Sequence, residues 1–180
     1  GSRTERFAAY TSGSSSSNAS HIKFQVKRVI LLAGCAQRAL NPDINASTIR
    51  VLNRLGVEVI VRKEAHCCGA LAHHIGEHKK GDAAMRAAIY AWHEEISTGA
   101  IDAIVVNASG CGTMVKDYGH LMRNDAEMAP LAATISAKAK DVSELLAELD
   151  LASILQPQIT SGCGAIAYHS ACSLQHGQKI

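Results

Sequence analysis

The sequence has few aromatic residues and almost no excess charge of either sign. Phe, Trp and Tyr make up 4% of the 180 residues, and 18 Lys and Arg face 16 Asp and Glu, for a formal net charge of +2. This even balance argues against nucleic acid or an anionic membrane as the main partner, because neither would be attracted by a strong overall field. Hydrophobic residues make up 47%, which excludes a disordered chain and favours a single domain with a proper core.

Long hydrophobic segments are also missing. No apolar run approaches the roughly 20 residues that span a bilayer, and the first residues lack the apolar stretch of a signal peptide. We therefore expect a cytoplasmic protein, held at the inner face of the membrane only through partners. Thiols in that compartment stay reduced, so the six cysteines are not expected to form a disulfide framework. Metal binding or catalysis becomes their leading use.

The amino-terminal residues differ in composition from the rest. Gly1-Ser2 resembles the cleavage scar of a purification tag, and serines fill positions 14–17. We interpret residues 1–24 as a tag or linker that is disordered.

From residue 25 onward, short apolar runs alternate with segments of helical periodicity. The predicted strands are 29–33, 57–61, 103–106 and 165–168, and the predicted helices are 41–55, a long region ending at Gly99, 114–122, 128–139 and 141–149, the last with a capping box at Asp141 and Glu144. This alternation predicts an α/β fold, a Rossmann-like parallel sheet flanked by helices. No glycine-rich phosphate fingerprint follows the first strand, so nucleotide binding is not predicted.

Four cysteines follow the predicted strands. Cys35 comes just after the first strand, Cys67 and Cys68 after the second, and Cys111 after the third. Right-handed crossovers bring the carboxyl ends of parallel strands to one edge of the sheet, where ligands of such folds bind. Cys67, Cys68 and Cys111 also lie near predicted helix amino termini, whose partial positive charge favours thiolate. Packing alone does not explain four thiols on one edge.

Three kinds of chemistry fit these thiols. A structural zinc ion needs four ligands, usually from short-spaced pairs. An iron–sulfur cluster lets the adjacent Cys67 and Cys68 reach different irons. A thiol enzyme would use Cys68 or Cys111 as nucleophile beside a histidine. The nearby histidines are candidate ligands, donors to sulfur or proton carriers: His66, His73, His74 and His120. Cys163 is interpreted as a small apolar residue.

Four separated blocks resemble, in the same order, the cysteine-rich CCG domain family. The blocks are Gly34–Arg38, His66–His74, Ala108–His120 and Tyr168–Gly177. Proteins with this domain include the cysteine-rich subunit of heterodisulfide reductase, lactate-utilisation proteins and the iron–sulfur subunit of glycolate oxidase, and the flanking residues are most similar to the last. The resemblance implies a first CCG domain over 25–164 and the start of a second, truncated unit over 165–180, in which Cys172 is the counterpart of Cys35.

The resemblance implies a 4Fe–4S cluster of the non-cubane kind, bound by Cys35, Cys67, Cys68 and Cys111. Ala108 stands where heterodisulfide reductase has a further cysteine, so Cys172 is the candidate fifth ligand. The implied function is electron transfer in a glycolate oxidase-like complex that oxidises 2-hydroxyacids. The implied partners are flavin-containing subunits and the remaining ferredoxin-like and second CCG regions of a parent chain. No catalytic residue is expected, and the chain is not expected to turn over substrate alone. The alternative is a structural zinc-binding CCG module with no redox role.

Overall fold

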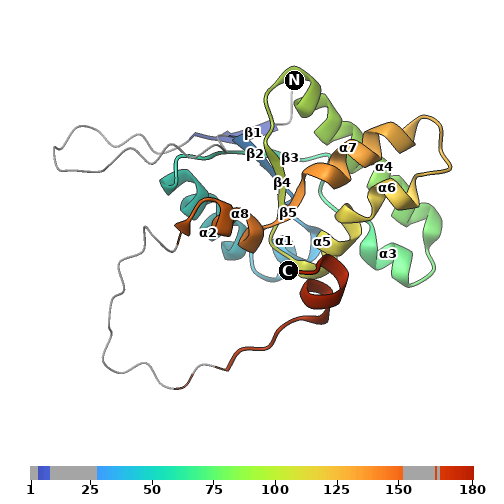
Figure 1. Cartoon of the computed structure of the whole chain (residues 1–180). Helices are drawn as coiled ribbons and strands as arrows, with labels where there is room; N and C mark the ends of the chain where they lie inside the picture. The colour runs from blue at the N-terminus through green and yellow to red at the C-terminus, as the bar shows by residue number, and fades with distance from the viewer. Residues whose placement is uncertain (1–3, 9–27, 152–164, 166) are drawn as a thin grey trace.

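One sheet of five strands organises the residues that the computed structural model describes, which are 4–8, 28–151, 165 and 167–180 (Figure 1). Its strand order is β1-β3-β2-β4-β5. The strands are β1 (Thr4–Phe7), β2 (Arg28–Leu31), β3 (Glu58–Arg62), β4 (Ala103–Val106) and β5 (Ala139–Asp141). β2 pairs in parallel with β3 and β4, and β4 pairs in parallel with β5. The carboxyl ends of β2, β3 and β4 therefore share one edge, as predicted.

Helices cover both faces of the sheet (Figure 1). They are α1 (Cys35–Leu40), α2 (Asp43–Arg54), α3 (Ala70–His74), α4 (His78–Thr98), α5 (Ser109–Lys116), α6 (Tyr118–Leu121), α7 (Met128–Lys138) and α8 (Val142–Glu148). Successive strand residues point to opposite faces. Ile30 and Ile104 join a core with α4, α5, α6 and α7, whereas Val29 and Val105 join a second core with α2 and α8. The predicted α/β architecture is confirmed.

None of the helices in the described part of the chain combines the length and the apolar character that a bilayer crossing requires.

The first strand differs from the sequence-based prediction. A disordered tag or linker is predicted over residues 1–24, yet Thr4–Phe7 form β1, which pairs antiparallel with β3 and makes the sheet mixed rather than wholly parallel. An edge strand has one neighbour and can carry charged residues, so the hydrophobic pattern does not reveal it. Glu5 of β1 forms an ion pair with Lys63 at 2.9 Å. Residues 9–27, which include the serine run, lie outside the described residues.

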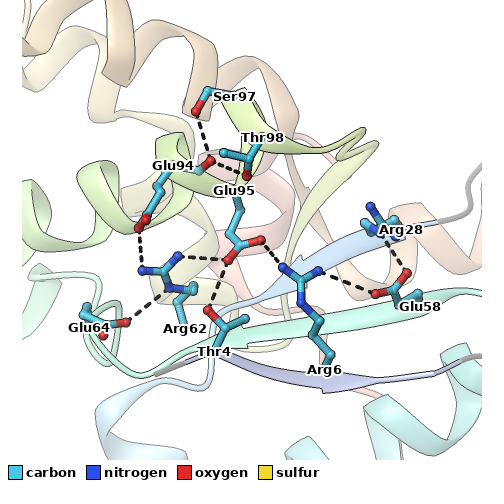
Figure 2. Close-up of polar contacts among 10 residues, drawn as sticks. All are labelled: Thr4, Arg6, Arg28, Glu58, Arg62, Glu64, Glu94, Glu95, Ser97 and Thr98. Carbon is cyan, nitrogen blue, oxygen red and sulfur yellow. Dashed lines mark hydrogen bonds and ion pairs between the residues drawn. The ribbon is translucent and has the colours of Figure 1, made fainter. Parts of the chain in front are cut away.

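A buried ion pair ties β1 and β3 to α4 (Figure 2). Arg62, at the end of β3, donates from Nη1 to Glu95 of α4 at 2.9 Å, and both side chains are more than nine-tenths buried. The same carboxylate accepts from Thr4 Oγ1 at 3.1 Å and from Arg6 Nη2 at 3.0 Å. Arg62 also donates from Nη2 to the more exposed Glu94 at 2.7 Å. Three elements therefore meet at one buried carboxylate.

The helix predicted over 114–122 is divided into α5 and α6, and α5 begins at Ser109, whereas α7 and α8 follow the prediction closely. α7 ends at Lys138, one residue before the predicted end, and the next three residues form β5, a strand too short for its pattern to be recognised in the sequence. The predicted capping box is confirmed, since the Ser143 amide donates to Asp141 at 2.9 Å and the Asp141 amide donates to Glu144 at 2.7 Å.

The carboxyl-terminal residues depart from their predicted strand. Residues 165, 167 and 168 have irregular backbone, and residue 166 lies outside the described residues. A π-helix, η1 (Ser173–Gln178), follows Cys172. It packs against α5, because Thr113 Oγ1 donates to the Ser173 carbonyl at 3.2 Å and Gln178 Nε2 donates to the Ser109 carbonyl at 3.0 Å.

Candidate metal centre

Four cysteines lie at the carboxyl edge of the three central strands. Cys35 is the first residue of α1, Cys67 and Cys68 precede α3, and Cys111 lies in the first turn of α5. The Cys67 thiol donates to Cys35 Sγ at 3.5 Å, and the side chains of Cys68 and Cys111 hydrogen-bond to each other. Cysteines that are 32 and 43 positions apart in the sequence thus form two contacting thiol pairs.

Burial increases across these thiols from the surface into the core. Cys35 is exposed, Cys67 and Cys111 are half-buried, and Cys68 is only 2% exposed. A group bound by all four would therefore reach solvent at the Cys35 side and have its other side shielded by the core. That arrangement suits a centre that exchanges electrons at the surface while the protein keeps water away from most of it.

The two thiols of the Cys68–Cys111 pair differ in acidity. The hydrogen bond between them raises the pKa of Cys68, as does burial, and the same bond lowers the pKa of Cys111. Of the two thiols, Cys111 is therefore the one that loses its proton first. Burial raises the pKa of Cys67 to about 11. Like charges disfavour one another at such short range, so four thiolates can coexist here only around added positive charge, which a bound metal supplies.

The glycine of the Cys67-Cys68-Gly69 turn has two structural tasks. Its φ of +81° is a conformation that other residues rarely adopt, and a Cβ atom there would lie 2.6 Å from the Gly81 carbonyl oxygen and 3.1 Å from Met85 Cγ of α4. Its amide donates to Cys67 Sγ at 3.4 Å. Gly69 thus lets the turn pack closely on α4 while its N–H points at a candidate ligand sulfur.

Tyr118 supports the same turn from the core. Its hydroxyl donates to the Cys68 carbonyl at 2.8 Å, and its ring stacks on Trp92 with centroids 6.4 Å apart. Burial raises the pKa of Tyr118 well above its ordinary value, so the hydroxyl stays protonated and remains a donor. In the sequence Tyr118 reads as one member of a helical apolar stripe, and its contact with Cys68, 50 positions away, has no local signal.

We expect Tyr118→Phe to lower the free energy of unfolding of the metal-free chain by about 1–2 kcal/mol, because the buried Cys68 carbonyl loses its partner. Urea unfolding measures the change. Tyr90→Phe is the matched control, since Tyr90 is exposed and its hydroxyl donates to Glu127 on the surface; we expect less than about 0.5 kcal/mol. Equal losses in the two variants would contradict the supporting role.

Cys172 lies directly before η1 and is exposed. It lines a groove of about 390 Å³ between α3, α5 and η1, together with His73, His74 and Thr113, and none of the four other thiols lines that groove. His66, directly before Cys67, and His120, in α6, have exposed side chains. Cys163 lies outside the described residues. Among the predicted site residues, the structure therefore brings together Cys35, Cys67, Cys68 and Cys111.

The thiol arrangement departs from a ready-made site for one ion. A tetrahedral zinc ion with bonds of about 2.3 Å needs all four sulfurs about 3.8 Å from one another. Within the described ranges, no three His, Cys, Asp or Glu side chains converge as the ligands of a single metal ion. The adjacent Cys67 and Cys68 suit a cluster better than a single ion, because each can bind a different metal atom.

Comparison with known proteins also points to a cysteine-rich domain and to iron-sulfur proteins. Residues 29–116 match the cysteine-rich domain family CCG. The chain is 45% identical over 154 residues to the glycolate oxidase iron-sulfur subunit of Escherichia coli (strain K12), covering 86% of this chain and 37% of that protein. It is 32% identical to the probable glycolate oxidase iron-sulfur subunit of Bacillus subtilis (strain 168), over 83% of this chain and 32% of that protein.

A more distant relative is lactate utilization protein A of Geobacillus thermodenitrificans (strain NG80-2), with 24% identity over 82% of this chain and 58% of that protein. The chain thus spans about a third of the length of the two glycolate oxidase relatives. No solved structure matches it. The family match begins in β2 and ends in α5, so it contains all four clustered cysteines. Residues 29–116 of this chain are thus a cysteine-rich domain of the CCG family.

Proposed function

We propose that this chain is an iron–sulfur electron-transfer module of a glycolate oxidase-like complex that oxidises 2-hydroxyacids. The observation that carries the proposal is the pairing of four thiols from three separate turns, graded from exposed Cys35 to buried Cys68. The two relatives named as glycolate oxidase iron-sulfur subunits support it. The proposed partners are flavin-containing subunits of that complex and the ferredoxin-like and second CCG regions of a longer parent chain.

The proposed cofactor is a 4Fe–4S cluster, of the non-cubane kind, with Cys35, Cys67, Cys68 and Cys111 as ligands. The donor set fits, because thiolates are the usual ligands of such clusters, which supply a one-electron redox centre. Backbone amides donate to Cys67 from Gly69 and to Cys68 from Ala70, and donors to ligand sulfurs favour the reduced state by offsetting its negative charge.

Two boundaries and one ligand extend the proposal. We assign the first CCG domain to residues 25–164 and the start of a second unit to 165–180. Cys172, which lines a groove with His73 and His74, is the proposed fifth ligand. The proposed location is the cytoplasm, with attachment to the inner face of the membrane through the partner subunits.

Elemental analysis of the anaerobically purified chain tests the function directly. We expect iron and acid-labile sulfide in near-equal amounts, about four of each per chain, well above zinc. The solution should absorb broadly near 400 nm, roughly where thiolate–iron charge transfer falls, and dithionite should bleach it. Stoichiometric zinc without sulfide, with unfolding on chelation, would instead assign a structural zinc-binding role with no redox function.

A further inference from the structure

A chain of side-chain amides lies behind the cysteine loops. Asn107, the first residue after β4, donates from Nδ2 to Asn45 Oδ1 at 3.0 Å and to Thr48 Oγ1 at 2.9 Å, both on α2. Asn45 in turn donates from Nδ2 to the carbonyl of Ala33 at 2.7 Å. Ala33 lies in the loop that leads from β2 to Cys35. The residue after β4 is therefore linked, through α2, to the approach to the first candidate ligand.

A second link reaches the same loop from its other side. Gln37, two residues after Cys35, donates from Nε2 to the backbone oxygen of Asn107 at 3.1 Å and to its Oδ1 at 2.8 Å. Gly34, just before Cys35, has a φ of +68°, and a Cβ atom there would lie 2.7 Å from Gln37 Oε1. Asn107 thus contacts the Cys35 loop on one side and stands four residues before Cys111 on the other.

Packing holds the start of the Cys35 loop, where Leu32 is buried, but it does not hold the helix that follows. α1, which begins at Cys35, has no buried residue, whereas α5, which carries Cys111, buries Gly112, Met114 and Val115. The orientation of α1 and of Cys35 at its start therefore depends mainly on polar contacts. Asn107 uses its side-chain oxygen as an acceptor and its amide nitrogen as a donor to two partners. Both protons of the asparagine amide are used in these two hydrogen bonds. Asp has no amide proton to donate, and Leu has neither a donor nor an acceptor, so neither residue can reproduce this pattern.

We propose that Asn107 is a positioning residue that fixes the Cys35 loop relative to the Cys111 loop, with Gln37 as its partner on α1. This inference deepens the proposed function, since the loops it joins carry the proposed cluster ligands. It predicts that the Cys35 loop keeps its position in the metal-free chain, so that Cys35 stays in contact with Cys67 before any metal binds.

The test measures that contact without metal. The metal-free chain is equilibrated with mixtures of oxidised and reduced glutathione, where oxidised glutathione takes two electrons and two protons from Cys35 and Cys67, leaves a disulfide and becomes two reduced molecules. Peptide mapping reports the fraction of the 35–67 disulfide. From this fraction we obtain the effective concentration of the Cys35 thiol at Cys67. We expect it to be about tenfold lower in Gln37→Leu and in Asn107→Asp, because each change releases the Cys35 loop from a fixed orientation.

Matched controls make the same chemical changes elsewhere. Gln175→Leu and Asn124→Asp replace exposed side chains and should stay within about twofold of the wild-type value. In chain reconstituted with iron and sulfide, the two test variants should also lose their visible absorption to an iron chelator faster than the controls do. That second readout depends on the cluster, whereas the disulfide equilibrium does not.

The outcomes separate this inference from the proposed function. If the folded Gln37→Leu variant forms the 35–67 disulfide as readily as the wild type does, the positioning role is overturned, whatever metal the chain binds. This result is sufficient even if Asn107→Asp does not fold. An equal fall in the controls overturns it as well, because the effect would then be general. A selective fall in the test variants, in a chain that takes up no iron, supports positioning and rejects the proposed function.

Discussion

Cys111→Ser chain, reconstituted anaerobically with iron and sulfide, should retain less than about a tenth of the wild-type iron and sulfide. The physical reason is that Cys111 is the more acidic thiol of its pair. The hydrogen bond from Cys68 lowers the pKa of Cys111, so Cys111 gives up its proton to a metal more readily than Cys68 does. A serine hydroxyl remains protonated and is a poor ligand for iron at neutral pH. Iron and sulfide analysis and the absorption near 400 nm both report the loss.

Cys172→Ser is the matched control for that experiment. Cys172 is an exposed thiol that lines a groove apart from the four clustered thiols, so the variant should take up iron and sulfide as the wild type does. Loss of the cluster in Cys172→Ser would establish Cys172 as a fifth ligand. Full loading of Cys111→Ser would contradict the proposed ligand set.

Glu95→Ala should lower the free energy of unfolding by about 3 kcal/mol, because it leaves the buried Arg62 guanidinium without its closest buried partner. The loss should fall at the lower end of the range for broken buried pairs, since Arg62 keeps contacts with Glu94 and Glu64. The substitution also removes the carboxylate that accepts hydrogen bonds from Thr4 Oγ1 and Arg6 Nη2. Denaturant unfolding of the metal-free chain gives the value.

Glu94→Ala is the control for the buried pair. The Glu94 side chain is 63% exposed although it contacts the same guanidinium at 2.7 Å, and exposed ion pairs contribute less than about 1 kcal/mol. A loss in Glu94→Ala that matches the loss in Glu95→Ala would show that burial of the carboxylate does not set the strength of this junction.

The central strands and the common edge of the cysteines follow from the sequence alone. Val29–Leu31 and Ala103–Val106 are continuous apolar runs because each is buried on both faces, and that burial leaves a pattern that is easily recognised. Each of the four cysteines follows a strand of the central sheet, so the geometry of parallel strands is sufficient to bring the thiols together. The apolar pattern of these segments agrees with their place at the centre of the sheet, which is why the strands and the common edge of the cysteines are predicted correctly.

The supporting contacts could not be predicted in the same way. Asn107 in the sequence is a polar residue in a turn, and its partners Asn45 and Gln37 are 62 and 70 positions away. Tyr118 belongs to an apolar stripe whether or not its hydroxyl meets Cys68. Such contacts depend on the side-by-side placement of elements from distant parts of the chain, and neither periodicity nor spacing encodes that placement.

β1 has a consequence for handling the protein in solution. It pairs with β3 along Val59–Arg62 and presents the charged Glu5 and Arg6 to solvent. A variant shortened at its amino end to begin at β2 would leave the backbone amides and carbonyls of β3 open beside apolar Val59 and Val61, the kind of edge that recruits another chain. The first strand is therefore a safeguard against self-association, and truncation for crystallisation or fusion should spare it.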